Sequence, residues 1–144
     1  MFINERGLSL IKSFESLQLK SYVCPAGKWT LGYGHTGTDV KPNQTITTAE
    51  AEELLLKDIE NFNIHIQHLI TAQLNENQFS ALVSFTFNVG IDNLKSSTLL
   101  KKVNSNPSNP TIKNEFLKWV YANKSILNGL VKRRTAESDL YISV

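Results

Sequence analysis

Hydrophobic spacing along the chain predicts a helix, then a short hairpin, then a series of helices. In residues 4–15, apolar side chains recur every three or four positions, as on one face of a helix. Strand-forming residues then dominate residues 20–35, interrupted by Pro25-Ala26-Gly27. This pattern predicts a short antiparallel hairpin that turns near residues 25–28.

Helical spacing resumes after residue 45. Thr47 and Glu50 stand three residues apart, as in a capping box, and an apolar stripe follows them. The predicted helices cover residues 47–70, 75–89, 97–103, 113–121 and 129–140. We therefore expect an α+β fold of one domain, residues 1–144. An N-terminal helix and a small β lobe (strands about 18–40) would occupy about 1–45, attached to a mainly helical lobe of about 46–144.

Composition places the chain among ordinary globular proteins. Hydrophobic residues make up 41% and charged residues 19%, and no apolar stretch reaches the length of a membrane span. The first residues lack the basic and apolar regions of a secretory signal peptide. The single cysteine excludes an internal disulfide. No Cys or His cluster has the spacing of metal ligands, so we expect no metal and no other cofactor.

Charge is divided unevenly along the chain. Residues 1–90 hold six Lys or Arg against nine Asp or Glu, and residues 91–144 hold nine against four. A basic half suits a polyanionic partner such as cell wall or nucleic acid, although a solvated basic face has the same composition. Aromatic residues are not interleaved with basic ones on one element, which argues against nucleic acid.

Glu15 is the strongest candidate for a catalytic group. It ends the first predicted helix, next to Phe14. A carboxyl group beside apolar side chains keeps its proton more readily because burial penalises the charged form, and a general acid needs that proton. An exposed surface glutamate is the alternative.

The spacing around Glu15 resembles a known catalytic signature. Glu15, eight residues, Cys24, five residues and Thr30 resemble the Glu–Asp/Cys–Thr pattern of phage-type lysozymes, the endolysins of glycoside hydrolase family 24. Residues 24–36, 81–90 and 129–137 are similar to further blocks of that family. The resemblance implies a lysozyme-like fold and cell lysis by hydrolysis of the β-1,4 bond between N-acetylmuramic acid and N-acetylglucosamine in peptidoglycan, with inversion. Glu15 would protonate the leaving oxygen, and Cys24 and Thr30 would support the attacking water.

Cysteine at position 24 changes the expected chemistry. A free thiol has a pKa of about 8.5 and is mostly neutral near pH 7, whereas aspartate is ionised there. Three alternatives follow: the small thiolate fraction suffices, a basic or hydrogen-bonding neighbour lowers the thiol pKa, or Thr30 and Glu15 carry most of the rate with Cys24 as a modest helper or an occasional nucleophile. If Cys24 lines the cleft, alkylation or oxidation of its thiol lowers activity.

Five further residues are candidates for contact with the substrate: His35, Phe87, Asn88, Arg133 and Arg134. We expect His35 to pair with Asp58, which would raise the histidine pKa. An aromatic face and an amide suit sugar rings and acetamido groups, although Phe87 also fits a core position. The arginines suit peptide or muramic carboxylates, with ordinary surface charge as the alternative. We interpret Trp29, Trp119 and Tyr121 as packing residues.

Two other functions fit parts of the sequence. A lytic transglycosylase needs only one glutamate, and a non-catalytic wall-binding module needs none. The family resemblance also implies a monomer without a membrane span, made in the bacterial cytoplasm and acting on the wall after a holin-type partner releases it to the periplasm.

Overall fold

The computed structural model describes residues 1–143, which form two compact units. Unit 1 comprises residues 1–11 and 62–143, and unit 2 comprises residues 12–61. Helix α2 (Thr48–Leu69) contributes residues to both. Among residues 1–143, no helix combines the length and apolar character needed to cross a membrane.

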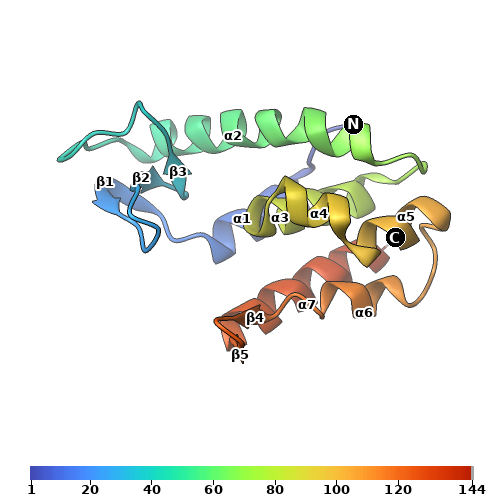
Figure 1. Ribbon diagram of the computed structural model, residues 1–144. Helices are drawn as coiled ribbons and strands as arrows, with labels where there is room; N and C mark the ends of the chain where they lie inside the picture. The colour runs from blue at the N-terminus through green and yellow to red at the C-terminus, as the bar shows by residue number, and fades with distance from the viewer. Residues whose placement is uncertain (144) are drawn as a thin grey trace. The chain divides into compact units, whose positions relative to one another are not determined.

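Unit 2 is built on a three-stranded antiparallel sheet in the order β1 (Gln18–Val23), β2 (Trp29–Gly32), β3 (His35–Thr36) (Figure 1). The β1–β2 turn closes where the Cys24 amide donates to the Lys28 carbonyl at 2.9 Å. Gly27 lies in this turn at a φ of +79°, a conformation that glycine adopts without steric cost. The predicted hairpin and its turn are confirmed.

Local capping signals fix the starts of the first two helices. In α1 (Glu5–Phe14), the Asn4 side chain accepts the Gly7 amide at 3.0 Å, as an N-cap does. Before α2, the Thr47 hydroxyl accepts the Glu50 amide and the Glu50 carboxylate accepts the Thr47 amide, both at 3.1 Å. The predicted capping box is confirmed.

Unit 1 is helical. It contains α3 (Glu76–Val89), α4 (Ile91–Ser96), α5 (Thr98–Ser105), α6 (Ile112–Phe116) and α7 (Asn128–Ile142), with a small hairpin of β4 (Tyr121–Ala122) and β5 (Ser125–Ile126). Helix α7 packs along α3 and α6 (Figure 1). Phe85 and Phe116 are fully buried there with their rings 5.6 Å apart. The predicted α+β class, a small antiparallel sheet with a mainly helical remainder, is confirmed.

Two element predictions were wrong. The helix expected over 113–121 ends at Phe116, and Tyr121 lies instead in β4, which pairs with β5. The turn between these strands, Asn123 and Lys124, has φ of 50° and 68°. Tyr121 is 60% exposed, so its interpretation as a packing residue is also wrong. Helix α4 was not predicted; Gly90, at a φ of +93°, ends α3 and the chain begins a new helix directly.

Candidate active site

Glu15 follows the last residue of α1 and is half-buried. The turn between β2 and β3 approaches it closely. Gly34 has a φ of +81°, and a Cβ atom placed on it would stand 3.5 Å from Oε2 of Glu15. A Cβ atom at that distance would make an ordinary van der Waals contact, so the positive φ is what favours glycine here, and the turn lies next to the carboxyl group. In the sequence, the two glycines at positions 32 and 34 indicate this turn.

Cys24 and Thr30 lie across the β1–β2 hairpin from each other. Cys24 directly follows β1 and is half-buried, and Thr30 is buried in β2 opposite Tyr22. The Lys28 carbonyl accepts the Cys24 amide at 2.9 Å, and it stands 3.0 Å from the Thr30 hydroxyl, whose single proton it shares with the Cys24 sulfur. One backbone carbonyl therefore orients both residues.

Hydrogen bonding lowers the pKa of the Cys24 thiol. The backbone of Lys28 is the largest cause and the Thr30 side chain the next, and together they outweigh the partial burial that raises the pKa. Hydrogen bonds to sulfur stabilise the thiolate relative to the thiol. Of the three alternatives for the chemistry at position 24, this geometry favours a hydrogen-bonding neighbour that lowers the thiol pKa.

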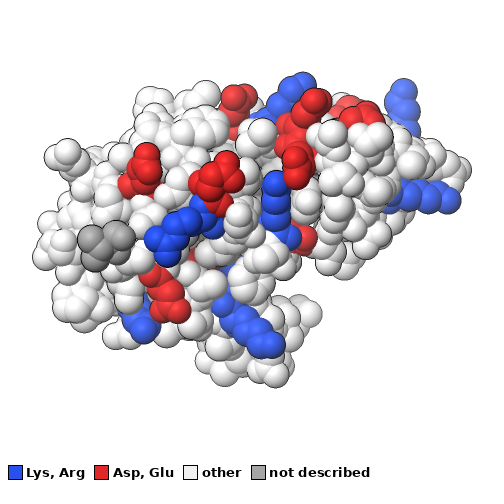
Figure 2. All heavy atoms as spheres, turned by 180° about the vertical axis from the view of Figure 1, so that it is seen from behind, with Lys and Arg blue, Asp and Glu red and all other residues white. Residues whose placement is uncertain are grey.

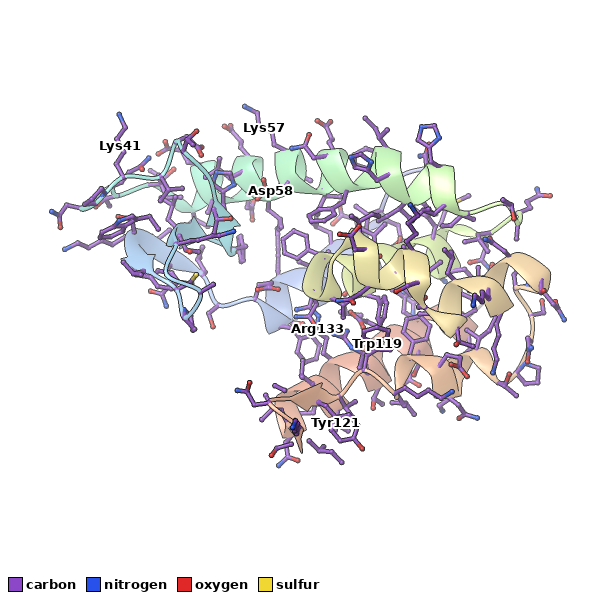
Figure 3. The ribbon with its side chains drawn as sticks, in the orientation of Figure 1. Lys41, Lys57, Asp58, Trp119, Tyr121 and Arg133 are labelled. Atoms are coloured by element: carbon purple, nitrogen blue, oxygen red, sulfur yellow. The ribbon has the colours of Figure 1, made fainter. Side chains whose placement is uncertain are left out.

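The predicted pair of His35 with Asp58 is confirmed, and a second carboxylate joins it. Nδ1 of His35 lies 2.9 Å from Asp58 on α2 (Figure 3), and Nε2 lies 3.0 Å from Asp39. Carboxylates only accept hydrogen bonds, so this geometry favours the imidazolium form, in which both ring nitrogens donate. Burial lowers the pKa of His35, but the hydrogen bonds and charges of Asp58 and Asp39 outweigh it and raise the pKa.

This arrangement gives His35 a positioning role in unit 2. His35 directly follows Gly34, the residue that approaches Glu15, and its ring ties β3 to α2. Both nitrogens are occupied by carboxylates within the protein. Contact of His35 with the substrate stays a prediction.

Phe87 and Asn88 lie at the end of α3, in unit 1. Phe87 is half-buried and packs on Phe62, with ring centroids 5.7 Å apart. Asn88 is exposed, and its Oδ1 accepts a hydrogen bond from Arg134. The exposed amide remains a candidate for contact with a sugar or a peptide.

Arg133 and Arg134 are not surface charges, so that alternative is wrong: their exposed fractions are 3% and 0%. Both bind the carboxylate of Glu137, which is itself fully buried and accepts the Ser84 hydroxyl at 2.6 Å. Arg134 also donates from Nε to the Trp119 carbonyl at 3.0 Å. Direct contact of the arginines with the substrate stays a prediction.

Sequence reasoning missed Glu137 and Ser84 as members of this network. The sequence does carry a signal for Glu137, because it follows Arg134 by three residues and Arg133 by four. Side chains at these spacings lie next to each other on a helix. Nothing local in the sequence points from Ser84 to Glu137, which are 53 positions apart.

The structure thus gathers Glu15, Cys24, Thr30 and His35 in unit 2, and Phe87, Asn88, Arg133 and Arg134 in unit 1. A carboxyl group together with a thiol and a hydroxyl can donate a proton and orient water, the two tasks of glycoside hydrolysis. Within residues 1–143, no three His, Cys, Asp or Glu side chains are grouped to hold a metal ion.

Comparison with known proteins gives consistent matches. The model of the family described as phage lysozyme matches residues 12–137. An endolysin of Bacillus phage B103 is 45% identical over 99% of this chain and 55% of its own length. An endolysin of Acyrthosiphon pisum secondary endosymbiont phage 1 is 42% identical over 99% of both chains. The muramidase domain of SpmX from Asticaccaulis excentricus superposes with a TM-score of 0.91 at 33% identity, covering 99% of this chain and 98% of that one. The chain therefore spans just over half the length of the Bacillus phage relative.

Proposed function

Because the chain belongs to the phage lysozyme family, we propose that it is an endolysin that hydrolyses peptidoglycan. The bond cleaved is the β-1,4 link between N-acetylmuramic acid and N-acetylglucosamine. The observation that carries this proposal is the close approach of the Gly34 backbone to the Glu15 carboxyl group, in the unit that also holds Cys24 and Thr30.

In the proposed reaction, Glu15 gives its proton to the glycosidic oxygen as the bond to the anomeric carbon breaks. Water attacks that carbon from the opposite face and loses a proton to the Cys24 thiolate, while the Thr30 hydroxyl orients the water. The product is a reducing sugar with inverted configuration. The lowered pKa of the Cys24 thiol supports its assignment as the base.

The remaining parts of the proposal combine what the family implies with the contacts of His35. The chain acts as one lysozyme domain and as a monomer, without a cofactor. It is made in the bacterial cytoplasm and reaches the wall after a holin-type partner opens the membrane. His35 positions the Gly34 turn, and Phe87 and Asn88 contact the substrate.

The test compares hydrolysis of purified cell wall by wild type, Glu15→Gln and Cys24→Asp, with Glu5→Gln as an exposed control on the same helix. General acid catalysis contributes about 10²–10⁴-fold, so Glu15→Gln should lose at least that factor while Glu5→Gln stays active. NMR of fresh products should show reducing ends in the α configuration. Anhydro ends would identify a transglycosylase. A non-catalytic wall-binding module would leave the wall uncut even as wild type, and Glu15→Gln would bind the wall as wild type does.

A further inference from the structure

One ion pair of unit 2 joins the helix that leads to Glu15 to helix α2. Nζ of Lys12, in the last turn of α1, lies 2.9 Å from Oε1 of Glu52 on α2. Both residues belong to unit 2, as Glu15 does. They stand 40 positions apart, so no local pattern in the sequence links them. The proposed chemistry leaves this contact without a role.

Stability of the fold does not account for this ion pair. Charged side chains of both signs are scattered over the face drawn in Figure 2. The side chains of Lys12 and Glu52 are 29% and 47% exposed, and an ion pair so open to water contributes little to stability. What distinguishes this pair is its place next to the candidate acid.

Lys12 lies on the part of α1 that determines where Glu15 stands. Glu15 directly follows Phe14, the last residue of the helix, so its carboxyl group moves with the last turn. Lys12 precedes Glu15 by three residues, which is about one helical turn. A side chain of Lys12 that is held by α2 therefore limits how far the end of α1 can unwind or swing.

Helix α2 also holds the turn that lies next to the Glu15 carboxyl group. Asp58, six residues after Glu52, binds His35, and His35 directly follows Gly34 in that turn (Figure 3). One helix thus carries two tethers, Glu52 to the end of α1 and Asp58 to the turn. A rigid element between two such contacts keeps the carboxyl group and the turn in a constant arrangement.

We propose that Lys12 and Glu52 are positioning residues for the Glu15 carboxyl group, an inference that rests on the proposed function. Their ion pair holds the last turn of α1 to α2, so that the Glu15 proton is directed at the glycosidic oxygen of the bound glycan. A displacement of about 1 Å at a reacting group costs up to about 100-fold in rate. Because the pair orients the acid and does not hold the sugar, it acts on kcat.

The activity test neutralises each partner with a side chain of similar size. Lys12→Met and Glu52→Gln should each lower kcat on purified cell wall roughly 5- to 10-fold, with KM unchanged. The double variant should lose no more than either single variant, because each change breaks the same contact. Lys12→Arg keeps the charge and the reach and should retain the wild-type kcat. Lys57→Met and Glu53→Gln, which neutralise exposed residues of α2, are the matched controls and should behave as wild type.

The direction of the two effects separates positioning from a change in local charge. Loss of a cation and loss of an anion alter the electric field at Glu15 in opposite senses, so an electrostatic role would move kcat in opposite directions. Loss of positioning lowers kcat in both variants. The proposal is overturned if Lys12→Met and Glu52→Gln act in opposite directions, if their losses multiply in the double variant, if only KM changes, or if the controls lose as much.

Amide hydrogen exchange tests the tether without any substrate. Lys12→Met should speed exchange at the amides of residues 13–15 several-fold and leave the rates in the buried helix α3 as in wild type. Unchanged rates at residues 13–15, or an equal acceleration in α3, would overturn the proposal. If wild type releases no reducing ends from the wall, the proposed function fails instead, and the exchange rates still decide whether the ion pair holds the end of α1.

Discussion

At the scale of single residues, hydrogen bonds favour the charged form of two titratable side chains in unit 2. The imidazolium of His35 is stabilised by Asp58 and Asp39, and the thiolate of Cys24 by Lys28 and Thr30. In both residues these bonds outweigh the effect of burial. The stability of the fold and the reactivity of the thiol should therefore depend on pH in directions that can be measured.

Stability should depend on pH through the His35 pair. The raised pKa means that the pair stabilises the fold fully below the ordinary value of 6.5, and that this stabilisation is lost as pH rises through the raised value. Asp58→Asn should lower the free energy of unfolding by about 1–2 kcal/mol at pH 5.5 and by progressively less at higher pH. Denaturant unfolding of both proteins from pH 5 to 9 measures this. A constant difference across that range would contradict it.

At low pH, the stabilisation that Asp39 gives to the fold changes with pH in the opposite direction to that of His35. Hydrogen bonding to His35 lowers the pKa of Asp39 below its ordinary 3.8, so its stabilisation is present above that value and is lost as pH falls through the lowered one. An NMR titration of the His35 ring in wild type and in Asp39→Asn should give a lower histidine pKa in the variant. An unchanged histidine pKa would show that the Asp39 carboxylate does not stabilise the charged ring of His35.

The thiol of Cys24 should lose reactivity when Thr30 is replaced. Thr30→Val removes a hydrogen bond that lowers the thiol pKa, so the pH profile of alkylation by iodoacetamide should move to higher pH. Cys24 is the only cysteine, so the reaction reports this site alone. Thr36→Val, in the neighbouring strand β3, is the control. Identical profiles for Thr30→Val and wild type would show that the hydroxyl does not act on the sulfur.

At the scale of elements, the sequence predicted what local chemistry determines. The Thr47–Glu50 capping box and the 25–28 turn depend on residues a few positions apart, and both form. The β4–β5 hairpin was missed because each strand has two residues, too few for an alternating pattern, and its turn contains no glycine. The fold of this segment depends on what it packs against.

The hairpin turn should accept glycine with a gain in stability. Lys124 has a φ of 68°, which costs a side-chain-bearing residue more than glycine, and Asn-Gly is the preferred pair for such turns. Lys124→Gly should raise the free energy of unfolding by about 0.5–1 kcal/mol, measured by thermal unfolding. Lys124→Ala separates the loss of charge from the backbone effect and should give no gain. A destabilised glycine variant would contradict the turn geometry.

At the scale of the whole molecule, the candidate site was predictable only in part. Glu15, Cys24 and Thr30 were found from their spacing within 16 consecutive positions. The partners of Arg134 were not, because Asn88 and Trp119 lie 46 and 15 positions away and no local pattern links them. Both units hold buried or half-buried charges in contacts between elements, and such contacts become visible only in the folded chain.

The two buried glutamates of unit 1 should differ sharply in what their loss costs. Glu137 neutralises Arg133 and Arg134, which are themselves buried, so Glu137→Gln leaves guanidinium charge inside the protein and should cost about 3–5 kcal/mol. Glu115 binds Lys102 and Lys118, whose side chains are 28% and 65% exposed and can turn into water. Glu115→Gln should therefore cost about 1–2 kcal/mol. Chemical denaturation of both variants measures the difference. Equal losses would mean that the guanidinium groups of Arg133 and Arg134 also reach water once Glu137 is replaced.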